Sequence, residues 1–322
     1  MNPTATTARA PDASLHDDAI LPFAVEPLDV RGRLVRLGPE LDAMLRRHAY
    51  PAPVARLLAE ATALAALLGS SLKGEARFQL QARGAGPVSM LVVDYDAPEN
   101  LRAYARFDAA TLAGHGAASP LGAGHLAFTI EPGRGAARYQ GIVDLDEGGL
   151  EGAARRYFER SEQIPSVVRL AAGEVVTSDG ANWRAGGLLA QFLPKSELRA
   201  RVADLDPGDA PEGLARHAVA EDEAWTEAKA LAGTVEDHEL LDPALSGERL
   251  LFRLFHERGV RVFALGALRD ACRCTDARVE ALLAGFPAED RAAMVGEDGV
   301  ISVTCEFCGK LRRYAPSRFS AA

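Results

Sequence analysis

The amino-acid sequence predicts an α+β protein. We expect an N-terminal core domain of mixed helices and antiparallel sheets, then a helical linker, then a small C-terminal domain that holds every cysteine. Three observations carry this prediction. Hydrophobic residues in the first 194 positions follow strand and helix periods in turn, and short Gly-containing turns join neighbouring strands, which indicates hairpins rather than parallel βαβ units. The next segment is almost entirely Ala and charged residues. All four cysteines then lie in two short stretches.

Composition limits the class of protein. The chain has 322 residues, of which 48% are hydrophobic, enough to bury a sizeable core. Its net charge of −9 at pH 7 argues against a broad surface for nucleic acid, so no nucleic-acid partner is expected. Residues 1–19 lack the long apolar stretch of a secretory signal and are predicted to be disordered.

The most apolar stretch runs from Val54 to Leu68. It is interrupted by Arg56, Glu60 and Thr62 and is too short to span a bilayer, so we predict a buried helix and no membrane partner. A cytoplasmic protein follows from these observations. In that compartment, clustered cysteines more often bind metal or sense redox state than form permanent disulfides.

The core domain is predicted to span residues 20–194. Pro51 occupies a position that is favoured in a first helical turn, and the helix that it begins runs to about Leu68. A second helix is predicted over residues 151–163. Period-two alternation, bounded by turn residues, predicts strands at residues 30–38, 76–84, 87–96, 101–109, 125–133, 137–145 and 165–176.

Residues 195–235 are predicted to form the linker. Ala, Glu and Lys favour a helix from Leu214 to Leu231. Its apolar stripe has only three large members, Leu214, Trp225 and Leu231. Because helices owe most of their stability to packing such a stripe, this helix should be marginal by itself. On composition alone, a solvated linker helix is the simplest interpretation.

The C-terminal domain is predicted to span residues 236–316, with a tail over 317–322. Ser246 can cap a helix with one apolar face, and a short strand over 260–265 leads to the first cysteine pair. Thr275 begins another helix, and a strand over 300–304 leads to the second pair. The residues expected to face inward from these two helices are Leu250, Leu251, Leu254, Phe255, Val279, Leu282 and Leu283.

The cysteines follow the pattern C-x-C, thirty residues, then C-x-x-C, at Cys272, Cys274, Cys305 and Cys308. Two pairs separated by a small helical unit match a four-thiolate zinc site, in which one metal ion joins two chain segments. Because the residues after 236 offer little core, a metal would matter to their fold. We therefore predict one Zn²⁺ held by all four sulfurs. Cysteines that serve only as buried apolar residues would seldom all fall into two pairs.

Four thiolates around one Zn²⁺ carry net negative charge, which nearby cations can offset. The candidates are Arg273, Arg278, Lys310, Arg312 and Arg313. Metal and cationic neighbours both hold sulfur as thiolate, the form that oxidants attack. The spacing leaves two roles open: an inert structural clamp, or a sensor that loses zinc as disulfides form.

Other motifs predict less. His238 and His256 are expected to be solvated or structural, given four better ligands. The sequence CEFC alone suggests a thioredoxin-like dithiol, but that motif begins a helix in a βαβ context, whereas here it follows a strand and has a partner pair. The Gly-rich residues 114–125 lack the strand–loop–helix context of a phosphate-binding loop, and no G-x-S-x-G motif is present. No active site is predicted, so we do not expect an enzyme.

Several stretches together resemble one family, the redox-regulated 33 kDa heat-shock chaperonins, which are bacterial holdase chaperones. They are YFERSEQIPS (157–166), AGGLLAQFLP (185–194), LLDPALSGERLLFRLFHERGVRVF (240–263), CRC (272–274) and VTCEFCGK (303–310). The earlier region, from about Leu21, agrees with the family in length and in its general residue pattern but has fewer distinctive residues. Thr275 stands where a serine is common, which leaves the ligands intact. GKLRRYAP carries a longer basic stretch than the family pattern, which leaves the strand after the second cysteine pair in doubt.

The resemblance implies a mechanism. In the reduced family member the four thiolates bind zinc and the chaperone is inactive, so the C-terminal domain is a zinc-binding redox-switch domain. Oxidant, especially with mild heat, converts neighbouring cysteines to disulfides, which in this chain implies Cys272–Cys274 and Cys305–Cys308. Zinc then leaves, the C-terminal domain unfolds and the linker loses its structure.

The resemblance also implies the partners. Surface exposed on the linker and core binds unfolding client proteins without ATP, and the family forms a homodimer on activation. Leu214, Trp225 and Leu231 are the candidate client-binding residues on the linker. The acidic, Ala-rich linker would stay soluble when disordered and could wrap varied clients.

Overall fold

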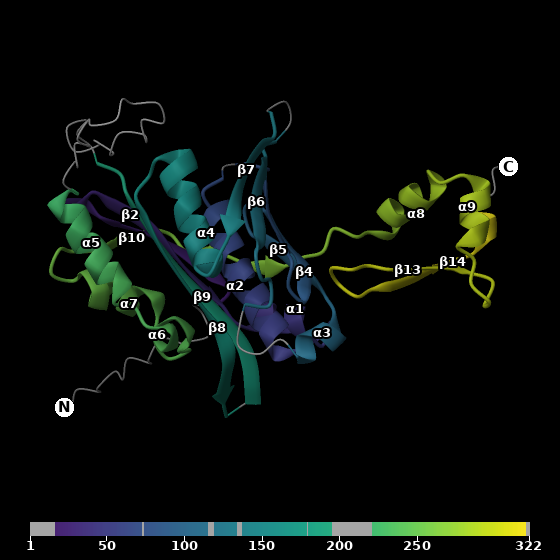
Figure 1. The fold of residues 1–322 in the computed structure, drawn as a ribbon, viewed down its shortest axis with the longest axis horizontal. Helices are drawn as coiled ribbons and strands as arrows, with labels where there is room; N and C mark the ends of the chain where they lie inside the picture. Colours follow the sequence, from purple (N-terminus) through teal and green to yellow (C-terminus); the bar gives the residue numbers. More distant parts are fainter. Residues whose placement is uncertain are drawn as a thin grey trace, which may run out of the picture.

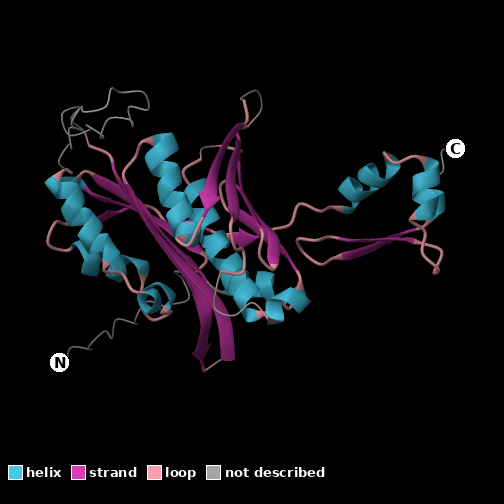
Figure 2. Ribbon diagram, viewed as in Figure 1, coloured by secondary structure: helices cyan, strands magenta, loops and turns pink. Residues whose placement is uncertain are grey.

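The computed structural model describes residues 17–72, 74–114, 119–133, 137–178, 180–194 and 221–319. Two large sheets enclose a long helix, further helices cover the outer face of one sheet, and a small unit with the cysteines projects from the molecule (Figure 1). The mixture of helices with antiparallel sheets is plain in Figure 2 and confirms the predicted α+β class.

The first sheet has the order β10–β1–β2–β9–β8, with β11 also paired to β1, and all its pairings are antiparallel. Helices cover both of its faces, so β1, with the sequence AILPFAV, is buried at six of its seven positions. The strands are β1 (Ala19–Val25), β2 (Val30–Leu37), β8 (Ser166–Thr177), β9 (Gly180–Phe192), β10 (Arg261–Val262) and β11 (Gly266–Ala267), with a 3-10 turn, η2 (Glu26–Leu28), after β1.

The second sheet has the order β12–β5–β4–β3–β6–β7. All its pairings are antiparallel except that of β12 with β5. Burial alternates along β3 and β5, because one face packs on the helix between the sheets and the other does not. The strands are β3 (Arg77–Gly84), β4 (Val88–Asp96), β5 (Asn100–Phe107), β6 (Gly124–Glu131), β7 (Tyr139–Leu145) and β12 (Arg269–Asp270).

Helix α2 (Ala52–Gly69) lies between the two sheets and forms the centre of the core. Pro51 is its N-cap residue, as the sequence predicts to within one position. Among the described residues, α2 is the one helix with the length and apolarity to cross a membrane, and 78% of that stretch is buried inside the molecule. The other helices near the core are α1 (Pro39–Arg46), α3 (Ala109–Ala113) and α4 (Gly149–Tyr157), which continues into the π-turn η3 (Phe158–Glu162).

Three helices cover the outer face of the first sheet: α5 (Glu223–Gly233), α6 (Asp237–Leu241) and α7 (Gly247–Phe255). Ser246 caps α7, as predicted, by accepting a hydrogen bond from the backbone N–H of Arg249. The Trp225 ring on α5 stacks on Phe192 with ring centroids 5.8 Å apart. The described part of the predicted linker helix is therefore packed on the core rather than solvated.

The division of the chain into a core domain, a linker and a C-terminal domain remains a prediction. Two segments nevertheless lie elsewhere than the predicted boundaries imply. Asp17 pairs with the buried Arg184, and Asp18 accepts hydrogen bonds from backbone N–H groups, so the described end of the segment expected to be disordered is tied down before β1 begins. Residues 237–270 lie against the two sheets rather than with the cysteines, because α6 and α7 bury apolar faces there and β10–β12 extend the sheets.

The small unit that follows contains α8 (Asp276–Ala284), α9 (Ala288–Ala293), β13 (Ile301–Thr304), β14 (Leu311–Tyr314) and the 3-10 turn η4 (Pro316–Phe319). The strand left in doubt after the second cysteine pair is therefore present as β14. In this unit's cluster, only Leu283, Ile301 and Tyr314 are fully buried apolar side chains. The expectation that Leu282 faces inward is wrong, since it is 62% exposed. So small a core covers only a narrow stripe of α8.

Candidate metal centre

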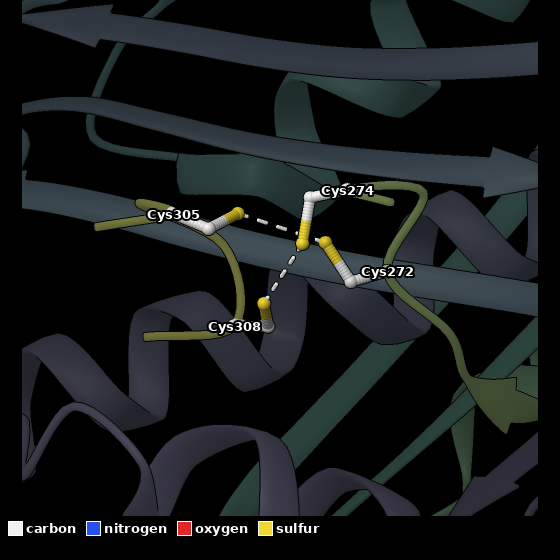
Figure 3. A group of neighbouring side chains, drawn as sticks. All are labelled: Cys272, Cys274, Cys305 and Cys308. Atoms are coloured by element: carbon white, nitrogen blue, oxygen red, sulfur yellow. Dashed lines mark hydrogen bonds between the residues drawn. The ribbon is translucent and has the colours of Figure 1, made fainter. Parts of the chain in front are cut away.

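The four cysteines lie on two loops that face each other. Cys272 and Cys274 follow β12 and precede α8, and Cys305 and Cys308 lie on the turn between β13 and β14. Their sulfurs converge on one point (Figure 3), with all four Sγ atoms within 4.8 Å of one another. The Sγ–Sγ distance is 3.7 Å for Cys272 and Cys305, and 3.2 Å for Cys274 and Cys308.

Local backbone chemistry shapes both loops. In the second, the N–H of Gly309 donates to the carbonyl of Cys305 at 2.8 Å, and the N–H of Cys305 donates to the carbonyl of Lys310 at 3.1 Å. Gly309 has φ of 66°, a left-handed conformation that glycine adopts without a steric cost. In the first, the Thr275 hydroxyl accepts from the N–H of Arg278 and caps α8, so threonine serves as well as serine here.

The donor set fits zinc. Four sulfurs at the usual Zn–S distance in a tetrahedron lie about 3.8 Å apart, close to the separation of Cys272 and Cys305. All four cysteines are free thiols, with sulfurs much farther apart than the roughly 2.0 Å of a disulfide bond. An all-thiolate set selects soft or borderline metals such as zinc over magnesium or calcium. The described residues contain no other such group of potential metal ligands.

The electrostatics of the cluster call for a cation. Burial, together with hydrogen bonds from the other three cysteines, raises the pKa of the Cys308 thiol to about 12, against a lowering by the backbone N–H of Lys310. Four thiols this close do not all ionise unless positive charge is supplied. A divalent metal ion supplies that charge and holds every sulfur as thiolate.

Of the five cations expected to offset the thiolate charge, the structure brings Arg312 to a sulfur. Its side chain is buried, and its Nη1 lies 3.4 Å from Cys274 Sγ. The guanidinium also donates to the carbonyl of Cys274 and, at 2.8 Å, to the carboxylate of Asp276, and this hydrogen bond lowers the pKa of Asp276.

The other four cations do not contact a cysteine sulfur in the described structure. Arg273 turns away from the cluster toward the second sheet, and Arg278 Nη1 lies 3.5 Å from the carbonyl of Arg273. Lys310 and Arg313 are exposed. The spacing of residues in the sequence brings all five near the cysteines, but the alternation of β14 turns Arg312 inward and Arg313 outward.

The predicted roles of the two histidines agree with their positions. His238 Nδ1 lies 3.0 Å from a Glu236 carboxylate oxygen on the surface, and His256 Nδ1 lies 3.3 Å from the carbonyl of Arg253. Neither belongs to the cysteine cluster.

The turn that carries the second cysteine pair contacts the core, which the sequence patterns did not predict. The Glu306 carboxylate accepts hydrogen bonds from Tyr104 at 3.3 Å and Arg106 at 3.2 Å. The Arg102 guanidinium lies 3.9 Å from the centroid of the Phe307 ring. His48 Nε2 lies 3.0 Å from the carbonyl of Phe307. The cysteine cluster therefore rests on β5 and on the turn after α1.

Comparison with known proteins agrees with this architecture. The family model described as "Hsp33 protein" matches residues 18–315, nearly the whole described chain. The chain belongs to the Hsp33 family. A 33 kDa chaperonin of Caulobacter vibrioides is 43% identical over 314 residues, covering 95% of this chain and 98% of that protein. A 33 kDa chaperonin of Ectopseudomonas mendocina is 38% identical over 295 residues, covering 91% and 90%.

A solved structure supports the fold. The 33 kDa chaperonin of Thermotoga maritima matches with a TM-score of 0.73, covering 94% of this chain and 96% of that one at 20% sequence identity. The Hsp33 relatives are named as chaperonins rather than as enzymes, so this Hsp33 chain is a member of a chaperone family. The family resemblance seen in the sequence is confirmed.

Proposed function

We propose that this Hsp33 chain is a redox-switched, ATP-independent holdase. In the reduced state it holds one Zn²⁺ on Cys272, Cys274, Cys305 and Cys308, and it acts in the cytoplasm on unfolding client proteins without catalysing a reaction. The observation that carries the proposal is the cysteine cluster inside a unit with only three fully buried apolar side chains. Such a unit depends on its metal, and thiolate ligands are the groups that oxidants attack.

The geometry of the cysteine cluster supports the proposed reduced state. When bound, zinc joins the C-x-C and C-x-x-C loops and holds their sulfurs as thiolates. Structural zinc contributes roughly 10 kcal/mol or more to the folding of small zinc-finger peptides. Burial of Leu283, Ile301 and Tyr314 stabilises by roughly 1.5–3 kcal/mol each and must also offset the entropy of ordering the unit, so it does not replace a contribution of that size.

Oxidation removes the ligands. For each disulfide, two thiolates give up two electrons to peroxide, which takes two protons as well and leaves as two waters. We propose Cys272–Cys274 and Cys305–Cys308 as the oxidised pairs, since each joins sulfurs on one loop and forms without the other loop. The Sγ–Sγ distances of 3.7 Å and 3.2 Å join one cysteine of each loop to one of the other, which suits a shared metal. Peptide mapping of the oxidised protein separates the two pairings.

The proposed consequence is release of the linker and exposure of client-binding surface. Trp225 and Leu231 lie on α5, which packs on the first sheet through Trp225, Ala228 and Ala232. Leu214, the third candidate, lies outside the described residues. Once the small unit unfolds, loss of α5 from the sheet would expose its apolar side chains and the face around Phe192 to clients and to a second copy of the chain in an active homodimer.

One experiment tests the proposal. Reduced, zinc-loaded protein is treated with peroxide under mild heat, and zinc release, free thiols and suppression of aggregation of a denatured client are followed together. The proposal requires zinc release, loss of four thiols and gain of suppression. Zinc retained with no gain of suppression would identify a static clamp. Turnover of insulin disulfides would identify a thiol–disulfide oxidoreductase that uses Cys305 and Cys308.

A further inference from the structure

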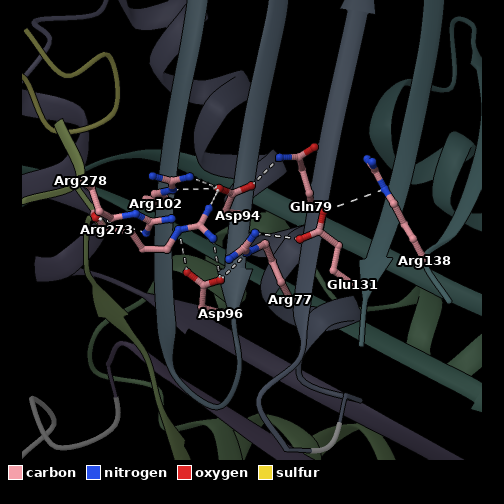
Figure 4. A network of polar contacts seen from close by, with 9 residues as sticks. All are labelled: Arg77, Gln79, Asp94, Asp96, Arg102, Glu131, Arg138, Arg273 and Arg278. Atoms are coloured by element: carbon pink, nitrogen blue, oxygen red, sulfur yellow. Dashed lines mark hydrogen bonds and ion pairs between the residues drawn. The ribbon is translucent and has the colours of Figure 1, made fainter. Parts of the chain in front are cut away.

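Arg273 lies between Cys272 and Cys274 in the sequence, yet its side chain bonds to residues of the second sheet. Its Nη2 donates to Asp94 Oδ2 at 2.5 Å, and its Nη1 donates to Asp96 Oδ1 at 3.3 Å. Both carboxylates stand on β4, on the face of the second sheet that points away from α2 (Figure 4). Asp94 lies 179 residues from Arg273 in the sequence.

The two carboxylates form part of a buried ionic network. The Asp94 side chain has no exposed surface, and it also accepts hydrogen bonds from Arg102 Nε at 2.8 Å and Gln79 Nε2 at 2.8 Å. Asp96 accepts from Arg77 Nε at 2.8 Å. The Arg273 side chain is 21% exposed. A guanidinium so far withdrawn from water needs its carboxylate partners, because an unpaired buried charge is costly.

We propose that Asp94 and Asp96 are a receptor for Arg273, which acts as a positioning residue for the metal centre. Docked Arg273 holds the C-x-C loop in its ligating conformation, so the zinc affinity of the cysteines depends on contact between the small unit and the core. This inference rests on the proposed zinc site. It goes beyond that site by assigning three side chains that touch neither the metal nor its ligands' sulfurs.

Loop entropy supplies the physical reason. Cys272 and Cys274 must present both sulfurs to one point, and a free loop loses conformational entropy when it does so. When the Arg273 side chain is bonded to Asp94 and Asp96, the loop has already lost part of this entropy before zinc binds. Groups that orient metal ligands in this way typically alter metal affinity about 10- to 100-fold.

The second loop has its own anchor on the same strands. Phe307, between Cys305 and Cys308, lies against Arg102, and Arg102 is bonded to Asp94. One guanidinium therefore contacts both the ring from the C-x-x-C turn and the carboxylate that receives Arg273. The two halves of the metal centre are aligned through a shared group on β5, which makes the docking face a continuation of the site.

The test is a double-mutant cycle on the reduced, full-length protein. Zinc affinity is measured by competition with a chromophoric chelator for wild type, Arg273→Gln, Asp96→Asn and the double variant. We expect each single change to weaken zinc binding about tenfold and the double variant to be no weaker than either. Asp96 forms no hydrogen bond with a cysteine, and besides Arg273 it pairs with Arg77, so the double variant decides whether its effect passes through Arg273. Additive effects, or affinities equal to wild type, overturn the inference.

Two further variants complete the design. Arg313→Gln removes an exposed arginine that follows the second cysteine pair on β14 and should leave the affinity unchanged. Arg273→Lys keeps the charge but loses the planar fork, so it should recover only part of the affinity. All zinc affinities are measured on the reduced protein, so they test the role of Arg273 whether or not peroxide activates the wild type. Failure of peroxide to activate the wild type would overturn the proposed function alone.

Discussion

Arg312 shows how one side chain can adjust the chemistry of a thiolate ligand. Its guanidinium lies within hydrogen-bond distance of Cys274 Sγ and also donates to Asp276 in the first turn of α8. A hydrogen bond from a cation stabilises negative charge on sulfur, which favours metal binding and lowers the reactivity of that sulfur toward electrophiles.

We predict that Arg312→Gln accelerates the reaction of the zinc-loaded protein with a chromogenic disulfide reagent several-fold and weakens zinc binding by about tenfold. The release of chromophore and chelator competition measure the two effects. Arg313→Gln, on the opposite face of β14, is the matched control and should react as wild type does. Equal rates for Arg312→Gln and its control would contradict the prediction.

Glu60 is a second residue with a measurable effect. It lies on the central helix α2, and burial raises its pKa from 4.5 to about 7, with Arg56 lowering it and Glu151 and Asp237 raising it. Folding therefore disfavours the ionised carboxylate. Below pH 4.5 the group is protonated in both folded and unfolded states, and the cost of ionisation in the folded state grows as the pH rises to about 7.

We predict that Glu60→Gln leaves stability unchanged below pH 4.5 and stabilises the protein above pH 7, by on the order of 2 kcal/mol. Urea unfolding on both sides of this window measures the difference. A stability gain that is the same at all pH values would show that shape rather than charge is responsible.

Helix α5 illustrates how an element with a weak stripe can still be ordered. Its small residues matter as much as its large ones: Ala228 and Ala232 are fully buried, and they let the helix lie close to the first sheet beside Trp225. The sequence pattern, which counted only large apolar residues, predicted a marginal solvated helix. Because alanine side chains are small, α5 packs close to the first sheet and buries backbone and Cβ surface. A count of large apolar residues leaves this surface out.

We predict that Ala228→Glu detaches α5, since an unpaired charge at a fully buried position costs about 3 kcal/mol or more. Trp225 fluorescence should shift to longer wavelength, and the reduced protein should gain suppression of client aggregation. Ala230→Glu places the same charge on the exposed face of the same helix and is the control. If both variants keep the wild-type spectrum, α5 is held by contacts other than this face.

Strands on the two sheets were not equally predictable. The second sheet has one face on α2 and the other turned away from it, so burial alternates along β3, β5 and β7, and strands were predicted at all of β3 to β7. β1 and β9 lie between α2 and the layer of α5 to α7, and their near-continuous burial removes the alternation. β10 falls within the strand predicted over 260–265, whereas β11 and β12 span only two residues each, too short for any periodicity.

At the scale of the whole molecule, the apolar core is distributed very unevenly. Two large clusters surround the first sheet, whereas the cysteine unit has one small cluster. We predict that zinc removal by a chelator unfolds residues 271–319 and leaves the two sheets folded. Hydrogen exchange should show lost protection in α8, β13 and β14 and retained protection in β3 to β6. Protection retained throughout would mean that the unit does not depend on metal.

The separation of residues along the chain explains how much of the candidate site could be predicted from the sequence. The four cysteine ligands could be predicted because the spacing within each pair is a short-range property of the sequence. The contacts of Arg273 with Asp94 and of Phe307 with Arg102 join segments about two hundred residues apart, and polar residues on the outer face of a strand look solvent-exposed in a sequence. Alternation alone does not identify the surface that covers them.

The pairing of β1 with β10 and β11 has a consequence for synthesis. One edge of β1 pairs with β2, which ends at residue 37, but its other edge pairs with residues 261–267, which are made much later. On the ribosome that edge stays open through most of translation, and open strand edges invite pairing with other chains. The residues that close this edge, 261–267, come shortly before the two cysteine pairs in the sequence. Maturation of the sheet and assembly of the metal centre therefore belong to one late event.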